Sequence, residues 1–350
     1  MRVFHAAALA AMVSAPALAN DTTAQLGTGG LVFVTNDTIS MTSEHLFVSP
    51  TEIKVVYEFN NTSSEPQHIL VAFPMPDIEG SPESMVAIPV EEAAYNGEAV
   101  SDPNNIFNFR TTFNGAPVAA ELHQYAFKNN IDYTKQLTKL GVPLLPFGEA
   151  TYAALAGLSD TALADLRHRG MVYGMDYDDG EGPKTDYAPI WTLRSTYSWE
   201  ATFPPGTSEV IHTYTPSIGG TVAASFMPHS EEDDYSAEQL AEYRKKYCMD
   251  DAFIAAVERT AIEEDGWTNY PFTESWISYI WSTGNNWAGP IGTFTLTVDK
   301  GSSDSLVSFC GENVKKIGPT TFEMTANDWY PPWDQELEIL LLNRVDWYDE

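Results

Sequence analysis

Large apolar residues alternate with polar ones along much of this chain, most regularly between residues 191 and 214. Successive side chains of an extended strand point to opposite faces, so this alternation predicts strands with one buried face. A Pro204-Pro205-Gly206 turn separates two such rows, and we expect them to form an antiparallel hairpin. The large side chains that share the buried parity are Trp191, Leu193, Tyr197, Trp199 and Phe203 before the turn, and Val210, His212 and Tyr214 after it.

The same pattern predicts two more hairpins. Residues 53–59 and 69–73 alternate on either side of a polar turn at 61–65. Residues 105–113 and 117–127 flank Asn114-Gly115, and Asn-Gly between alternating segments is a strong hairpin signal. A further strand at 294–298, preceded by a tryptophan-rich stretch that begins at Trp276, has one apolar and one threonine face. The sequence therefore predicts a mainly β fold of antiparallel β-sandwich layers.

Helical segments interrupt this pattern twice. Residues 129–184 contain Ala-rich stretches with Ser159 as a helix cap, and they predict a helical insertion. Residues 236–247 and 252–264 predict a helical pair before the C-terminal strands at 320–324 and 336–342. We therefore expect an N-terminal β-sandwich region over 20–222 with its insertion, and a second region over 223–350 made of the helical pair and C-terminal strands.

The first nineteen residues predict an export signal. A positive start at Arg2 precedes a short apolar run, and Ala17-Leu18-Ala19 fits the small-x-small cleavage rule. The mature chain would begin at Asn20, and we expect the protein to be periplasmic. No later segment approaches the ~18 apolar residues of a membrane-spanning helix, so no membrane insertion is expected after removal of the signal.

The chain is strongly acidic, with 49 Asp and Glu against 18 Lys and Arg and a formal net charge of −31. Such a surface repels phosphate backbones and anionic membranes, which makes nucleic acid a poor partner. The charge is typical of a solvated surface, and attraction of cations or of a basic partner is the alternative.

Cys248 and Cys310 are the two cysteines of the chain. Two cysteines in an exported protein usually pair, and this pair would fasten the helical pair to the C-terminal sheet. The alternative is a free thiol that acts with a histidine as a nucleophile.

Few residues form a pattern that carries chemistry. The mature chain's histidines lie apart in sequence, and no two have the spacing of metal ligands on one element. His212 lies on the buried face of its predicted strand, so we expect it to be a hydrogen-bonded core residue. No nucleophile elbow or phosphate-binding glycine loop is present, and no cofactor is expected. The acidic segment from Asp176 to Glu181 does not match an EF-hand, because the obligatory glycine position is occupied by Glu181; an irregular calcium loop remains open.

The segment around a Gly-Asn-Asn turn is the best candidate for a contact surface. Tryptophan faces flanked by amides suit sugar rings or a partner's side chains. The candidate ligand-binding residues are Trp281, Asn285, Asn286 and Trp287. The alternative is that the tryptophans of this stretch pack in the core.

Several motifs resemble those of an exported bacterial family known only as domain of unknown function 4424. They are residues 27–33, Ser43-Glu44, residues 48–50, residues 71–78, Thr283-Gly284, residues 286–291 and residues 307–311. Asn285 departs from the alanine that is common in this family. The resemblance spans nearly the whole mature chain and implies an immunoglobulin-like β-sandwich in an exported protein. It implies no known activity and no catalytic residues.

These observations favour a non-catalytic periplasmic binding or envelope-interaction protein whose partner is an envelope protein or a glycan. A secreted hydrolase that acts on glycan or peptide through scattered carboxylates or His212 is the first alternative. A calcium-stabilised adhesion module is the second. Because no catalytic motif is present, the sequence favours a protein that is not an enzyme.

Overall fold

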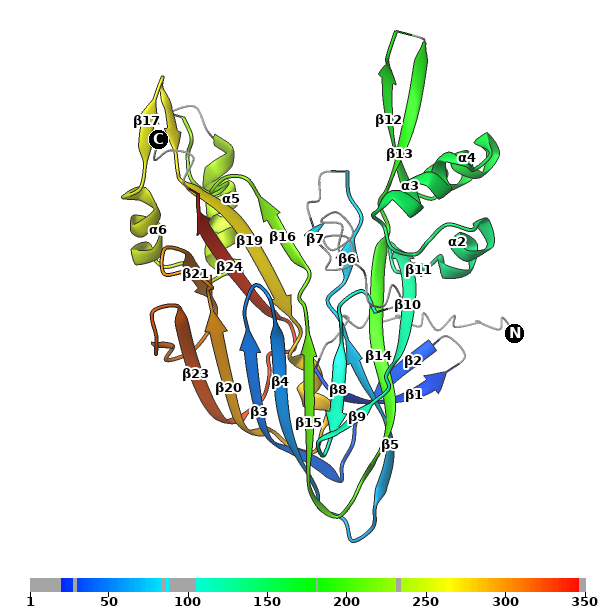
Figure 1. Ribbon diagram of the computed structural model, residues 1–350, viewed down its shortest axis with the longest axis vertical. Coiled ribbons are helices and arrows are strands. Elements are labelled where there is room, and N and C mark those ends of the chain that lie inside the picture. Colours follow the sequence, from blue (N-terminus) through cyan, green and yellow to red (C-terminus); the bar gives the residue numbers. More distant parts are fainter. Residues whose placement is uncertain are drawn as a thin grey trace, which may run out of the picture.

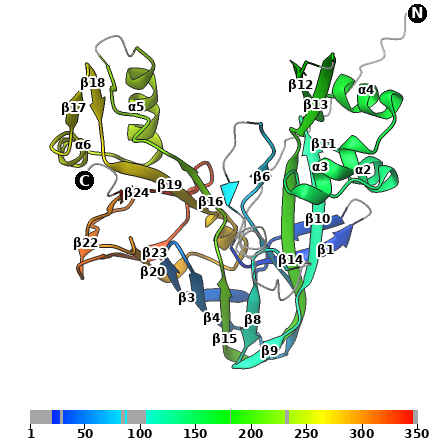
Figure 2. The ribbon, with the colours of Figure 1, turned by 45° about the horizontal axis from the view of Figure 1, so that its top comes forward.

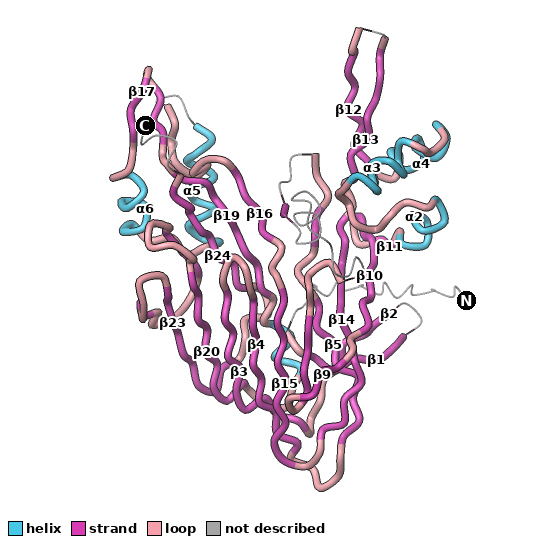
Figure 3. The backbone as a smooth tube through the Cα atoms, in the orientation of Figure 1, coloured by secondary structure: helices cyan, strands magenta, loops and turns pink. Residues whose placement is uncertain are grey.

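A computed structural model describes residues 20–345 apart from 28–29, 83–85, 88–104, 181 and 231–233. Strands dominate the described chain, and the helices lie at two outer corners (Figure 3). The predicted mainly β class with multiple sheets is confirmed. No helix in these residues has both the length and the apolar character needed to cross a membrane. The predicted export signal lies outside the described residues.

Within the described chain, the largest sheet has eight strands in the order β22-β23-β20-β3-β4-β15-β8-β9. Their bounds are Lys315–Lys316 (β22), Thr321–Trp329 (β23), Ile291–Asp299 (β20), Ile39–Val48 (β3), Ile53–Asn61 (β4), Gly206–Tyr214 (β15), Arg110–Phe113 (β8) and Ala116–Val118 (β9). The β3–β20 pair is parallel, whereas the other pairs of this sheet are antiparallel. The expectation of antiparallel layers is therefore wrong at this one position, because β20 comes from a distant part of the chain and adds to the edge of β3.

A second sheet has the order β11-β10-β14-β5-β1-β2, and β6 also pairs with β14. Its strands are Ile131–Asp132 (β11), Glu121–Lys128 (β10), Thr192–Phe203 (β14), Gln67–Pro74 (β5), Thr22–Gly27 (β1), Gly30–Val34 (β2) and Ile78–Glu79 (β6). A third sheet has the order β21-β24-β19-β16-β7, formed by Leu306–Phe309, Leu337–Arg344, Phe272–Tyr279, Ile218–Thr221 and Val86–Ala87. The β1–β2 hairpin projects from the lower part of the molecule (Figure 1).

The molecule has two arms that diverge from a shared lower end (Figures 1 and 2). One arm is built from β16, β19 and β24, with the helices α5 (Asp234–Lys246) and α6 (Asp251–Glu258) at its outer end. The other arm is built from β10 and β14. It has α2 (Thr134–Leu140), α3 (Glu149–Ala156) and α4 (Asp160–His168) at its outer end, beside a projecting hairpin of β12 (Val172–Asp178) and β13 (Pro183–Pro189). A small hairpin of β17 (Ile262–Glu264) and β18 (Trp267–Asn269) lies beyond the first arm.

Two of the predicted hairpins are wrong. Strands β4 and β5 do not pair, and neither do β14 and β15; in each case the turn carries the chain from one sheet to the other. The buried rows were identified correctly, but they face each other across the core. Phe59 of β4 and Phe203 of β14 meet edge-to-face with ring centroids 5.6 Å apart. Two strands can bury their rows of large side chains equally well as neighbours in one sheet or as members of two sheets that face each other. Alternation alone therefore does not show that the strands pair.

The Asn114-Gly115 turn is confirmed. Strands β8 and β9 pair directly around it, with φ of 49° at Asn114 and 76° at Gly115. Both angles lie in the left-handed region that this two-residue turn requires and that glycine and asparagine tolerate best. The strand that follows, β10, leaves this sheet and pairs with β14.

Both helical segments are present, but the helix predicted over 252–264 is too long: α6 ends at Glu258, and Ile262–Glu264 form strand β17. Ser159 caps α4 by accepting from the backbone N–H of Ala162. The insertion also contains the β12–β13 hairpin, so it is not wholly helical. Cys248, between α5 and α6, is bonded to Cys310 just beyond β21. The predicted staple between the helical pair and the C-terminal sheet is present.

One large core joins strands from all three sheets. It includes Tyr57 and Phe59 of the eight-stranded sheet, Phe73 of the second sheet and Tyr279 of the third. Strands β20 and β23 complete the sheet that β3 and β4 begin, so the predicted boundary near residue 222 does not separate the sheets.

Candidate functional site

The predicted contact loop is buried. It forms the 3₁₀ turn η1 (Ser282–Asn286) between β19 and β20. Trp281 and Trp287 are only 4% and 3% exposed, so neither indole face reaches solvent. In this arrangement the loop presents no aromatic surface, and ligand binding by these four residues stays a prediction that requires the loop to open.

Hydrogen bonds inside the protein explain this burial. The indole nitrogen of Trp281 donates to the carbonyl of Gln335 at 2.7 Å, and that of Trp287 donates to the carbonyl of Asp21 at 2.5 Å. The side chain of Asn285 donates to the carbonyl of Pro331 at 2.8 Å. Because their polar atoms find partners within the chain, both tryptophans can be buried fully.

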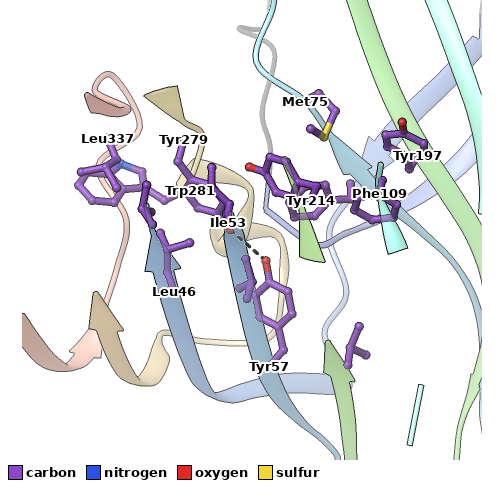
Figure 4. Close-up of a cluster of buried hydrophobic side chains, with 14 of the residues drawn as sticks. Leu46, Ile53, Tyr57, Met75, Phe109, Tyr197, Tyr214, Tyr279, Trp281 and Leu337 are labelled. Atoms are coloured by element: carbon purple, nitrogen blue, oxygen red, sulfur yellow. Dashed lines mark hydrogen bonds between the residues drawn. The ribbon is translucent and has the colours of Figure 1, made fainter. Parts of the chain in front are cut away.

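A polar cluster lies beside this loop, inside the large core. Nε2 of His212 is hydrogen-bonded to Oδ1 of Asp21 at 2.9 Å, and both side chains are fully buried. The expectation of a hydrogen-bonded core histidine is confirmed. The hydroxyls of Tyr57 and Tyr279 lie 3.1 Å apart and point toward each other (Figure 4). Glu44 accepts from Nδ2 of Asn20 at 2.9 Å.

Burial dominates the protonation of this cluster. Burial raises the pKa of the Glu44 carboxyl from 4.5 to about 8. It also raises the pKa of the Asp21 carboxyl, and the nearby His212 lowers that pKa in part. The pKa values of the Tyr57 and Tyr279 hydroxyls are raised well above their usual range for the same reason. Perturbed carboxylates beside a histidine resemble catalytic machinery. These groups, however, are buried in the core. The hydrolase hypothesis would require an open pocket that lets a substrate reach them.

Residues 176–180 of the acidic segment form the end of β12 and the start of the turn toward β13, and Glu181 lies outside the described residues. Oδ1 of Asp178 accepts from the backbone N–H of Gly180 at 2.8 Å, and Asp179 is paired with Lys184. Oδ1 of Asp176 accepts from Thr185 at 2.8 Å. Among the described residues, no group of three or more acidic, histidine or cysteine side chains could hold a metal ion.

An open groove lies between the two arms, with a volume of about 340 Å³. We call it the Trp276 groove. Its walls come from β6 and the segment before it, from β16, from β19 and from the end of α5. The lining residues are Pro76, Asp77, Ile78, Glu79, Ser217, Gly219, Lys246, Trp276 and Ser278.

Trp276 lies across a glycine of the neighbouring strand. Gly219 is its cross-strand partner in the β16–β19 ladder. A Cβ at Gly219 would lie only 1.8 Å from the indole nitrogen, so any larger residue would displace the ring. The absence of a side chain at Gly219 therefore lets the half-buried indole lie flat at the groove.

Charged and hydroxyl groups surround this indole. The carboxylate of Asp77 is held by Arg194 at 2.9 Å, with both side chains partly buried. Ser278 donates to Glu338 at 2.6 Å, and Nζ of Lys246 lies 3.7 Å from the same carboxylate. The disulfide is close to this group, because Sγ of Cys310 lies 3.7 Å from the carbonyl oxygen of Lys246.

Sequence reasoning identified the tryptophan-rich stretch but not the residue that lines the groove. The signal that could have found it is the Gly219-Gly220 pair, which marks a strand position where a neighbour approaches closely. Its partner strand cannot be known without the sheet order. Asp77, Lys246 and Trp276 come together only through tertiary structure.

The chain matches the model of one known protein family. The family described as a domain of unknown function (DUF4424) matches residues 19–340. The chain belongs to the DUF4424 family. The resemblance inferred from its motifs is thereby confirmed. A comparison with curated proteins gives no match.

Among solved structures, this DUF4424 chain is similar to a "putative nutrient binding protein" from Legionella pneumophila subsp. pneumophila str. Philadelphia 1. The two sequences are 14% identical, and the match covers 93% of this chain and 70% of that chain. The TM-score is 0.41, a level of similarity that carries no conclusion about the ligand of either protein.

Proposed function

We propose that this DUF4424 protein is an exported, non-catalytic binding protein of the periplasm, and that the Trp276 groove is its contact site. The observation that carries this proposal is the indole of Trp276, which lies across Gly219 and lines the groove. A half-buried indole with hydroxyl and carboxylate neighbours suits a ligand that is apolar on one side and polar at its edge. The immunoglobulin-like layering implied by the family resemblance belongs to the same proposal.

The chemistry of the groove favours a neutral oligosaccharide. A sugar ring has an apolar C–H face, which stacks on an indole, and equatorial hydroxyls, which bond to groups such as Ser217, Ser278 and Glu79. The net charge of −31 disfavours polyanionic glycans and nucleic acid. A glycan of the cell envelope fits these constraints better than a charged polymer does.

Titration with neutral tetrasaccharides tests the proposal. Cellotetraose, maltotetraose and chitotetraose would be added to the purified exported protein, with calorimetry and tryptophan fluorescence as readouts. We expect at least one to bind, and Trp276→Ala to raise its Kd about tenfold, equivalent to ~1.4 kcal/mol. Trp267→Ala is the matched control, because Trp267 is 59% exposed on β18, outside the groove.

Two outcomes would count against the proposal. One is the absence of a binding signal for all three sugars at millimolar concentration. The other is binding that survives Trp276→Ala unchanged. Release of reducing ends from the same sugars by purified protein would instead favour the hydrolase alternative.

A further inference from the structure

The buried loop holds a specific segment of the chain itself. Residues 20–22, which follow the predicted export cleavage site, are fully buried. The hydroxyl of Thr283 accepts from the backbone nitrogen of Asn20 and donates to its carbonyl at 2.7 Å. Termini are normally exposed and poorly ordered unless something ties them down. A completely buried segment at this position therefore needs an explanation.

The loop contacts each of these residues in turn. The carbonyl of Trp281 accepts from the side chain of Asn20 at 3.3 Å. The indole of Trp287 donates to the carbonyl of Asp21, and Nδ2 of Asn286 donates to the hydroxyl of Thr22 at 2.9 Å. A Cβ at Gly284 would lie 2.9 Å from Nδ2 of Asn20, so the glycine allows this close approach. The arrangement has the features of a binding site for an extended peptide end.

Two buried carboxyl groups favour a cation at this position, because burial raises the pKa of both and a nearby cation would let them ionise. Glu44 and Asp21 are buried on either side of Asn20, and among the described residues neither has a lysine or arginine as a partner. Oδ2 of Asp21 has no hydrogen-bond partner within the same part of the chain. A buried carboxylate is costly unless it is paired with a positive charge. The tyrosine hydroxyls beside Glu44 carry no positive charge.

We propose that the loop from Trp281 to Trp287 is the binding site of the chain's own processed N-terminus, and that the hydroxyl of Thr283 holds the α-ammonium group of Asn20 within the buried cluster that contains Glu44 and Asp21. Hydrolysis of the Ala19–Asn20 peptide bond by an export signal peptidase consumes one water. It leaves a carboxyl group on Ala19 and an amino group on Asn20. The hydroxyl of Thr283 accepts from the backbone nitrogen of Asn20 and would hold the freed amino group. The loop is thus a receptor for a terminus rather than for an external ligand.

Three consequences follow from this proposal. The exported protein begins at Asn20. Its α-amine is protected in the folded state, and any residue left in front of Asn20 disturbs the cluster. None of these consequences depends on the Trp276 groove, so this proposal and the proposed binding function can fail separately.

The test uses full-length protein exported from a bacterial host with its own leader. N-terminal sequencing and intact mass should show a chain that starts at Asn20. Acetylation of the α-amine by an N-hydroxysuccinimide ester at neutral pH should be at least about tenfold slower in native protein than in denatured protein, because reaction requires opening of the core. A different first residue, or equal rates in the two states, would overturn the proposal.

A second measurement uses a one-residue extension, with a serine inserted between Ala19 and Asn20 so that the mature chain carries one extra residue. We expect a Tm lower by several degrees, and we expect Thr283→Val to remove most of the difference between the two forms. Thr325→Val, at an exposed strand position, is the matched control and should leave that difference intact. An extended chain with the same Tm as the processed chain would contradict the proposal.

Discussion

Asp21 and His212, which lie 191 residues apart in sequence, form a hydrogen-bonded pair 2.9 Å apart at the centre of the molecule. Neither side chain has any exposed surface. The imidazole also stacks on the ring of Phe109, with centroids 5.1 Å apart. The pair therefore joins β15 to the chain segment that precedes β1, and it does so where water cannot replace a lost partner.

We predict that His212→Phe destabilises the protein by about 3–5 kcal/mol, because it leaves the carboxyl of Asp21 buried without its partner. The double variant Asp21→Leu, His212→Phe should recover at least half of this loss, since it removes the unpaired group as well. Urea unfolding followed by tryptophan fluorescence measures both values. His68→Ala is the control: its contact with Glu200 is exposed on both sides, and such pairs contribute less than about 1 kcal/mol. A double variant as unstable as the single one would mean that ring packing, not the hydrogen bond to Asp21, is what matters.

Gly219→Ala should displace Trp276 and lower stability by about 1–3 kcal/mol, the usual cost of overpacking. The same change should weaken any ligand binding in the Trp276 groove. Gly157→Ala is a matched control, because a Cβ there would lie 3.5 Å from its nearest neighbour, an ordinary contact distance. The free energy of unfolding and the fluorescence emission maximum of each variant provide the comparison. An unchanged emission maximum in Gly219→Ala would show that the indole does not depend on this glycine.

Removal of the disulfide should destabilise the protein by about 4 kcal/mol, the loop-closure term for a cross-link that spans some sixty residues. Cys248→Ser together with Cys310→Ser makes this change without leaving a free thiol. Because Sγ of Cys310 lies against the last residue of α5, Lys246, native-state hydrogen exchange should also become faster in α5. Thermal unfolding and exchange of the double variant give the two readouts. Equal exchange in α5 with and without the bond would refute the anchoring role.

The free energy of unfolding should decrease as pH rises from about 4.5 to about 7, because Glu336 titrates at a higher pH in the folded state than in the unfolded state. Burial raises the pKa of this carboxyl from 4.5 to about 7, so the folded state binds a proton that the unfolded state has already lost across this interval. Its carboxylate accepts from the backbone N–H of Trp281 at 3.0 Å and from Ser282 at 2.8 Å. Because the side chain is partly exposed, we expect a change of only about 1–2 kcal/mol.

Glu336→Gln provides the control for this pH dependence. The amide oxygen can still accept from the loop, but the side chain no longer titrates. Urea unfolding at several pH values between 4.5 and 7.5 should show a flatter profile for the variant than for the parent protein. Identical profiles would assign the pH dependence to other groups, among which Glu44 shifts in the same direction.

Local pattern was sufficient to find most strands and helices. The Ser159 cap, the Asn114-Gly115 turn and the two cysteines depend on neighbouring residues or on compartment chemistry, and each behaves as the sequence predicts. The prediction of hairpins failed at residues 61–67 and 203–206, where the chain changes sheets. Alternation specifies which face of a strand is buried, but not which strand lies beside it.

Some of the functional residues could likewise be identified from the sequence, and others only from the tertiary structure. Sequence alone identified the tryptophan-rich loop as unusual, the family, and the place where the mature chain is expected to begin. It could not show that this loop encloses residues 20–22, or that Trp276 lines a groove with Asp77 and Lys246. Burial of a tryptophan depends on what covers it, and the groups that cover Trp287 include Asp21, which is 266 residues away in sequence. Only the tertiary structure brings them together, because the sheet order is set by the packing of the whole core.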